Sequence, residues 1–160
     1  MNIEALILRM LEDGISENIV AYVALHAQSG CRISDLLAVD YRSISKHLNI
    51  SILQGKGSMA LVIQPLYFRD YWQIVRDAKL TPMASFNRFY FYRLYKKYGI
   101  VSHSPGNVNN SVTHAFRFKL AQDIQSIDNN KDRVQGALGH KSKKSTQHYY
   151  NSNIEPNVID

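Results

Sequence analysis

The sequence contains a single cysteine, Cys31, among its 160 residues. One thiol excludes an intramolecular disulfide and a cysteine-based zinc site, because each needs at least two sulfur atoms. No stretch approaches the roughly 18 consecutive apolar residues of a membrane-spanning helix. The short apolar run Ala5 to Leu8 lies between Glu4 and Glu12 with no basic segment before it. We therefore expect no secretory signal and no membrane span. The protein is expected to be cytoplasmic.

Acidic residues are also few, and their distribution is uneven. The chain has 19 Lys and Arg against 13 Asp and Glu, a formal net charge of +6. Residues 1–40 carry two basic and six acidic side chains, whereas residues 41–150 carry 17 basic and five acidic ones. No acidic cluster has the spacing of a magnesium site, which fits chemistry that uses no metal. A regional positive charge favours a polyanionic partner, of which nucleic acid is the commonest inside a cell.

Length and composition indicate one globular domain over residues 1–160, with an irregular tail at 151–160. Two aliphatic and β-branched runs, 48–53 and 59–63, flank a Gly-Lys-Gly turn and predict a β-hairpin with Lys56 at its tip. We therefore predict an α+β fold, mostly α-helical with a small antiparallel β-sheet. Apolar periodicity and capping residues predict helices over 3–13, 16–29, 32–39, 67–79, 85–98, 113–124, 131–138 and 142–150.

Three groups of residues have the chemistry of a phosphate site. His114 and Arg117 are three apart and share one face of a predicted helix, although such a pair is also common on solvated faces. Arg32 follows a glycine break at the start of a predicted helix, where the alternative is a surface ion pair with Asp35. The run Leu138-Gly-His140 precedes Tyr149, whose phenol is a candidate nucleophile.

Together these segments resemble the catalytic domain of the tyrosine recombinases, or phage-type integrases, over roughly residues 16–150. The resemblance is carried by the ordered segments Gly30-Cys-Arg-Ile-Ser-Asp-Leu-Leu37, Gly55-Lys-Gly57, Thr113-His-Ala-Phe-Arg117 and Leu138-Gly-His140 with Thr146-x-x-Tyr149. It implies a site-specific recombinase that cleaves and rejoins double-stranded DNA as a homotetramer on paired sites, without metal or ATP. A monomer in the absence of DNA is compatible with it. Relative to the family, we expect the N-terminal core-binding domain to be absent from this chain.

The resemblance also implies a role for each matching residue. Arg32 and Arg117 would bind the scissile phosphate, for which rigid guanidinium groups are well suited. His114 would take the proton of the phenol, and Lys56 would protonate the departing 5′ oxygen. The full implied set is Arg32, Lys56, His114, Arg117, His140 and the nucleophile Tyr149, with Asp35 supporting an active-site arginine.

Several assignments have alternatives. Tyr150 is adjacent to Tyr149 and points about 100° away on a helix, so only one of the two can face the phosphate. The aromatic and basic run 86–98 fits a helix whose aromatics partly pack in the core, and base stacking is its alternative. We assign Cys31 to packing and no role to His26. The loop lysines Lys141, Lys143 and Lys144 are predicted to contact the DNA backbone.

Two other functions fit the same composition. One is a catalytically silent DNA-binding regulator of the same fold, although none of the six catalytic positions is visibly degraded. The other is a small basic helical domain that binds RNA or a protein partner and matches the segments by accident. The sequence does not indicate the target DNA site or the direction of recombination.

Overall fold

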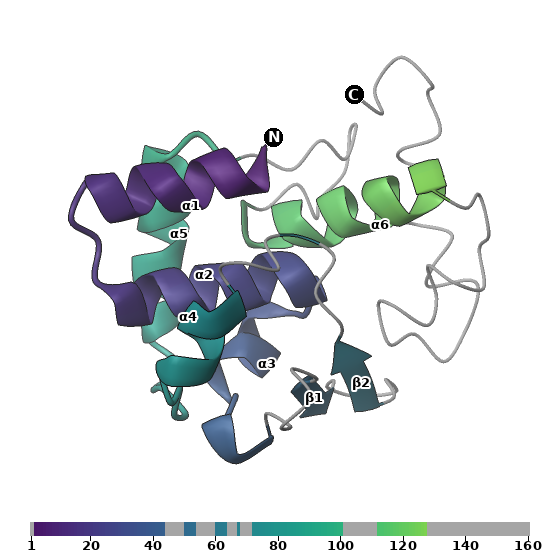
Figure 1. Cartoon of the computed structure of the whole chain (residues 1–160). Coiled ribbons are helices and arrows are strands. Elements are labelled where there is room, and N and C mark those ends of the chain that lie inside the picture. The colour runs from purple at the N-terminus through teal and green to yellow at the C-terminus, as the bar shows by residue number, and fades with distance from the viewer. Residues whose placement is uncertain are drawn as a thin grey trace.

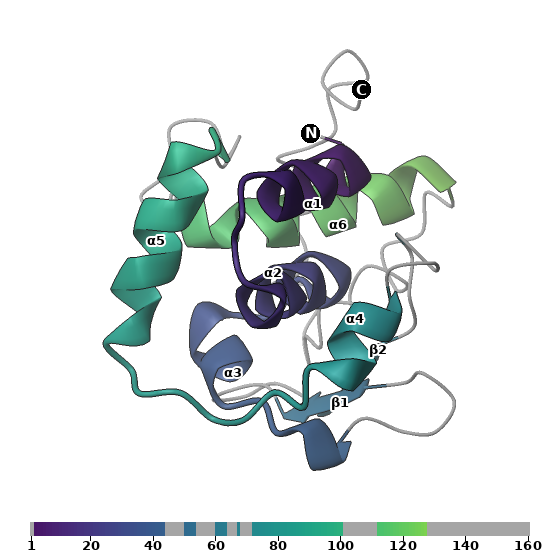
Figure 2. The ribbon, with the colours of Figure 1, turned by 60° about the vertical axis from the view of Figure 1, so that its left-hand side comes forward.

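Helix α2, Glu17–Ser29, lies at the centre of the molecule (Figure 1). The computed structural model describes residues 2–43, 50–53, 60–63, 67, 72–100 and 112–127. Figure 2 shows α2 in the middle, with the other helices arranged around it. These are α1 (Ile3–Glu12), α3 (Ile33–Leu37), α4 (Trp72–Asp77), α5 (Asn87–Lys97) and α6 (Ala115–Ile127). Two short 3₁₀ turns complete the set, η1 (Tyr41–Ser43) and η3 (Val112–His114).

The local sequence determines both ends of α2. Ser16 caps the helix, because its Oγ accepts a hydrogen bond from the Ile19 amide at 3.3 Å. Gly30 ends it in a left-handed conformation, φ 58°, that a residue with a Cβ adopts only at a cost. Every residue from Val20 to Ser29 is buried, as expected of a helix with neighbours on all sides. The predicted helix over 16–29 is confirmed.

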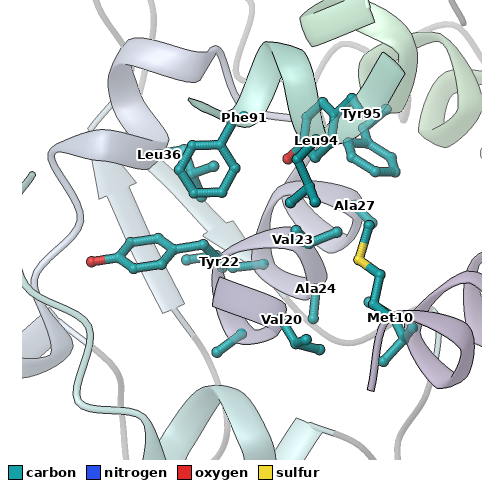
Figure 3. Close-up of a cluster of buried hydrophobic side chains, with 14 of the residues drawn as sticks. Met10, Val20, Tyr22, Val23, Ala24, Ala27, Leu36, Phe91, Leu94 and Tyr95 are labelled. Atoms are coloured by element: carbon teal, nitrogen blue, oxygen red, sulfur yellow. The ribbon is translucent and has the colours of Figure 1, made fainter. Parts of the chain in front are cut away.

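The hydrophobic core surrounds α2 and takes residues from all six of the helices given above. Figure 3 shows part of it. Met10 of α1, Leu36 of α3 and Phe91 of α5 reach it from three directions. Burying side chains of this size contributes about 1.5–3 kcal/mol each. Cys31 is fully buried beside this core, in agreement with its predicted packing role.

Two short strands, β1 (Ile50–Leu53) and β2 (Ala60–Ile63), pair in an antiparallel register from Ile50 opposite Ile63 to Leu53 opposite Ala60. The described helices greatly outnumber these strands in residues, and the predicted mostly helical architecture is confirmed. Within the described ranges, no helix is both long and apolar enough to cross a bilayer.

Two predicted helix starts are wrong. Tyr67, where a helix was expected to begin, is not helical: its backbone is bonded to the side chain of Gln28, and the described helix α4 starts at Trp72. The helix expected to be capped by Ser85 begins at Asn87, and its N-cap residue Phe86 makes no side-chain capping bond.

The aromatic residues of α5 divide between the core and the surface. Phe91 and Tyr95 are fully buried, as the core interpretation of this helix requires. Tyr98, the C-cap residue, is buried as well, whereas four other aromatics of the run 86–98 are exposed by 37–69%: Phe86, Phe89, Tyr90 and Tyr92.

Candidate active site

The segment Gly30–Arg32, which we call the arginine turn, joins the end of α2 to the start of α3. The Gly30 amide donates to the His26 carbonyl at 2.9 Å, and the Cys31 amide donates to Ser29 Oγ at 3.1 Å. Arg32 is the N-cap residue of α3, with an extended backbone at φ −69° and ψ 152°. The chain thus reverses within the arginine turn and presents Arg32, half-buried, at a helix start.

Arg117 contacts the arginine turn from the other end of the sequence. It lies in the first turn of α6 and is completely buried. Its Nη1 donates to the Gly30 carbonyl at 2.6 Å, across 87 residues of sequence. A guanidinium carries five donors in a fixed fork, and one of them holds the Gly30 carbonyl. The fold therefore brings Arg117 against the turn that ends in Arg32.

His114 and Asp35 lie around the same turn. His114 ends η3, three residues before Arg117, and is half-buried. Asp35 is in the first turn of α3 and is 8% exposed. A negative charge in that turn interacts favourably with the helix dipole. The pKa of the neighbouring Cys31 thiol is raised chiefly by burial, and the Asp35 charge adds a smaller effect in the same direction. Four predicted site residues thus gather around one turn: Arg32, Asp35, His114 and Arg117.

The other predicted site residues lie outside the described residues. They are Lys56, His140, Lys141, Lys143, Lys144, Tyr149 and the alternative Tyr150. The predicted helices over 131–138 and 142–150, the hairpin tip and the tail lie outside them as well.

Sequence reasoning missed His26, which lies directly beneath the arginine turn. Its Nε2 is 3.1 Å from the Cys31 carbonyl and its Nδ1 is 2.7 Å from the Tyr95 hydroxyl. Burial lowers the pKa of His26 to about 3, and the nearby charges of Arg117 and His114 act in the same direction, while the bond to Cys31 opposes them. His26 is therefore neutral at physiological pH. A signal was present in the sequence, since a polar residue inside an apolar helix needs buried partners.

Burial also governs the other ionisable groups under the turn. It raises the pKa of the Cys31 thiol to about 12, so this cysteine is a protonated, unreactive side chain at neutral pH. The pKa of the Tyr95 hydroxyl is raised well above its usual value by the same cause. His26, Cys31 and Tyr95, the three ionisable groups beneath the arginine turn, are thus uncharged at neutral pH.

A second polar network, also missed, starts two residues further along α2. The Gln28 amide donates to the Tyr67 carbonyl, and Gln28 Oε1 accepts from the Tyr67 amide at 3.0 Å. The Tyr67 hydroxyl donates to Asp123 of α6, which also pairs with Lys119 at 3.1 Å. Burial, followed by the Asp123 carboxylate, raises the pKa of Tyr67. This network connects α2 and α6 to the chain just after β2.

In the part of the chain that the structure describes, no three His, Cys, Asp or Glu side chains are grouped closely enough to hold a metal ion.

Comparison with known proteins gives matches in structure but not in sequence. No protein-family model matches the chain, and no curated protein matches it in sequence. The XerH site-specific recombinase, in a pre-cleavage complex with its difH substrate, superimposes with a TM-score of 0.62 at 17% identity over 93% of this chain. The Tn1549 transposon integrase, in complex with transposon right end DNA, gives a TM-score of 0.63 at 18% identity over 92% of this chain.

These matches cover 49% of the XerH chain and 58% of the Tn1549 integrase chain, so this chain spans about half the length of those proteins. Similarity at this level of identity establishes the fold. The protein has a fold like that of the tyrosine recombinase catalytic domain.

Proposed function

We propose that this chain is the catalytic domain of a site-specific DNA recombinase, which cleaves and rejoins DNA strands through a 3′-phosphotyrosyl intermediate. The observation that carries the proposal is the contact of Arg117 with the Gly30 carbonyl, because it brings two arginines from distant parts of the sequence to one turn. Two guanidinium groups match the charge that gathers on the non-bridging oxygens of a phosphodiester during attack.

The proposed reaction balances without a metal or a cofactor. The Tyr149 hydroxyl attacks phosphorus and gives its proton to His114, and a bond between phosphorus and the phenolic oxygen forms. The bond from phosphorus to the 5′ oxygen breaks, and Lys56 protonates that oxygen. His140 donates to a phosphate oxygen, and Asp35 supports an arginine. A 5′ hydroxyl from another strand then reverses the attack and joins the strands.

The remaining proposed parts follow from the fold and the charge. Residues 1–160 form one catalytic domain, and the β1–β2 pair is its small antiparallel sheet, with Lys56 in the connection between the strands. The 17 basic residues between positions 41 and 150 favour DNA as the partner, and XerH and the Tn1549 integrase were both captured on DNA. Lys141, Lys143 and Lys144 would contact the backbone of duplex DNA, and strand exchange would take place in a homotetramer on paired sites.

The test is covalent capture of DNA by the 160-residue chain. The probe is a pool of random-sequence duplexes, each with a nick at a fixed position. After cleavage, the short fragment that carries the new 5′ hydroxyl diffuses away, so it cannot reverse the attack and the adduct accumulates. Repeated selection of DNA that stays attached to denatured protein enriches the preferred site. We expect an adduct with the wild type and with Tyr150→Phe, and none with Tyr149→Phe. An adduct that persists in Tyr149→Phe contradicts the mechanism, and DNA binding with no adduct from any variant indicates the silent regulator instead.

A further inference from the structure

Both carbonyls that precede Arg32 in the arginine turn are bound by side chains from elsewhere in the fold. The Gly30 carbonyl accepts from Arg117 of α6, and the Cys31 carbonyl faces Nε2 of His26 at 3.1 Å. A carbonyl oxygen lies in the same rigid plane as the amide of the next residue. The bond to Cys31 therefore fixes the peptide plane that leads into Arg32, and the bond to Gly30 fixes the plane before it.

The chemistry of the acceptors determines the state of His26. A carbonyl oxygen can only accept, so Nε2 of His26 carries the proton that it donates to Cys31. In the neutral ring Nδ1 is then an acceptor, and it receives the Tyr95 hydroxyl proton across 2.7 Å. The hydrogen bonds thus run in one direction, from Tyr95 on α5 through His26 on α2 to the arginine turn.

The surroundings hold the His26 ring in this orientation. His26 and Tyr95 are both fully buried, and the His26 ring meets Phe116 edge to face at a centroid distance of 5.1 Å. Phe116 precedes Arg117, so the same packing contact connects the ring to α6. Because both side chains are fully buried, loss of one partner leaves a buried polar group unsatisfied.

We propose that His26 and Tyr95 are a positioning pair, which orients Arg32 toward the scissile phosphate through the Cys31 carbonyl. The inference rests on the proposed function, since it assigns these residues a task in strand cleavage. Neither side chain reaches the reacting atoms in this account. A neutral group suits the task, because it holds the turn without adding a cation that would compete with Arg32 and Arg117 for the phosphate.

The main experiment compares two variants, each of which lacks one tyrosine hydroxyl from the same region of the chain. Tyr95→Phe deletes the donor to His26 and keeps the ring, whereas Tyr98→Phe deletes a hydroxyl that donates to Asp13 Oδ2 at 2.7 Å, away from the turn. The readout is the single-turnover rate of adduct formation on the selected nicked duplex, with the duplex concentration varied. We expect Tyr95→Phe to lower the rate at saturation about tenfold with an unchanged half-saturating concentration, because small misplacements of a reacting group cost up to about 100-fold.

The same experiment can contradict the positioning pair, the proposed function or both. Equal rates at saturation for Tyr95→Phe and Tyr98→Phe, or a loss explained by the folded fraction alone, overturn the positioning pair. Wild-type protein that forms no adduct on any selected duplex overturns the proposed function, and the pair with it. An adduct from the wild type with no effect of Tyr95→Phe overturns the pair only.

Rescue at His26 tests the pair if Tyr95→Phe fails to fold. The amide of His26→Gln can accept from Tyr95 and donate to Cys31, whereas His26→Leu can do neither. We expect His26→Gln to keep within about threefold of the wild-type saturating rate and His26→Leu to lose about tenfold or more. Equal loss in both variants overturns the pair.

A spectroscopic measurement needs no DNA. The ¹⁵N chemical shifts of the His26 ring report which nitrogen carries the proton. We expect a neutral ring protonated at Nε2 at pH 7 in the wild type, and a mixture of tautomers in Tyr95→Phe. A proton on Nδ1 of the wild-type ring overturns the proposed direction of the hydrogen bonds and the positioning pair with it.

Discussion

Two hydrogen-bond networks start on helix α2, one at His26 and the other at Gln28, and they differ in charge. The His26 network contains a neutral imidazole, a hydroxyl and a carbonyl, all buried under the arginine turn. The Gln28 network ends in the Asp123–Lys119 ion pair, whose side chains are 23% and 18% exposed. The first holds the segment that carries Arg32, and the second holds the segment that follows β2.

The difference follows from where each network lies. The His26 network is fully buried, and its groups are neutral, so it adds no charge of its own beneath the arginine turn. The Gln28 network is partly exposed and tolerates a full charge, since water solvates what the protein does not. The bonds from Tyr95 and His26 are thus neutral, whereas the Gln28 network ends in charged groups.

The largest effect is expected from removing the charge above the neutral network. Arg117→Met keeps much of the volume of the side chain but loses the donor to Gly30 and to the phosphate. We expect adduct formation on the nicked duplex to fall at least about 100-fold, since one preorganised donor is worth about 2.7–4 kcal/mol in the transition state. Lys119→Met is the matched control on the same helix and is expected to stay within about threefold, because Lys119 pairs with Asp123 and has no contact with the arginine turn among the bonds described above. Equal losses of adduct formation in both variants would contradict the proposed role of Arg117 as a donor to the phosphate.

The next largest effect concerns stability. His26→Leu leaves the Tyr95 hydroxyl and the Cys31 carbonyl without their shared partner. At about 1–3 kcal/mol for each of the two buried unsatisfied groups, we expect the free energy of unfolding to fall by about 2–6 kcal/mol, measured by urea denaturation. A loss below about 1 kcal/mol would show that the buried bonds are not formed in solution.

The pH dependence of stability separates the two networks. The folded-state pKa of His26 is about 3, and an unfolded histidine titrates near 6.5, so the unfolded state binds one more proton between these values. Stability from this group is complete above pH 6.5 and falls as pH drops, by at most about 1.4 kcal/mol per unit. We expect the difference between the wild-type and His26→Gln unfolding curves to show this slope between pH 6 and 4. A flat difference would contradict the buried neutral imidazole.

The smallest effect is expected in the charged network. Tyr67→Phe removes the donor to Asp123 but leaves that carboxylate paired with Lys119 and partly hydrated. We expect a loss of about 1–2 kcal/mol in the same urea experiment, smaller than that of His26→Leu. A larger loss for Tyr67→Phe would reverse the ranking of the two networks.

The sequence predicts features whose causes are local. Ser16 and Gly30 mark the ends of α2 because a cap and a left-handed residue act within a few positions of the chain. The α4 boundary is different, because Tyr67 is bound by Gln28, 39 residues earlier, and no local pattern shows this. Long-range hydrogen bonds here override helix periodicity.

The candidate site shows the same division. Resemblance to a family singled out Arg32 and Arg117, and the structure brings Arg117 to the arginine turn. The resemblance did not indicate His26, whose partner Tyr95 is 69 residues away. The apolar residues around His26 in the sequence indicate that its ring is buried. Its partners, Tyr95 and Cys31, are seen only in the folded structure.

The most direct test of the central claim is to identify the amino acid that becomes attached to DNA. The adduct from the selected nicked duplex is digested with protease and nuclease, and the modified peptide is sequenced by mass spectrometry. We expect a 3′-linked nucleotide on the phenolic oxygen of Tyr149. A nucleotide on any other residue, or linkage through a 5′ phosphate, would contradict it.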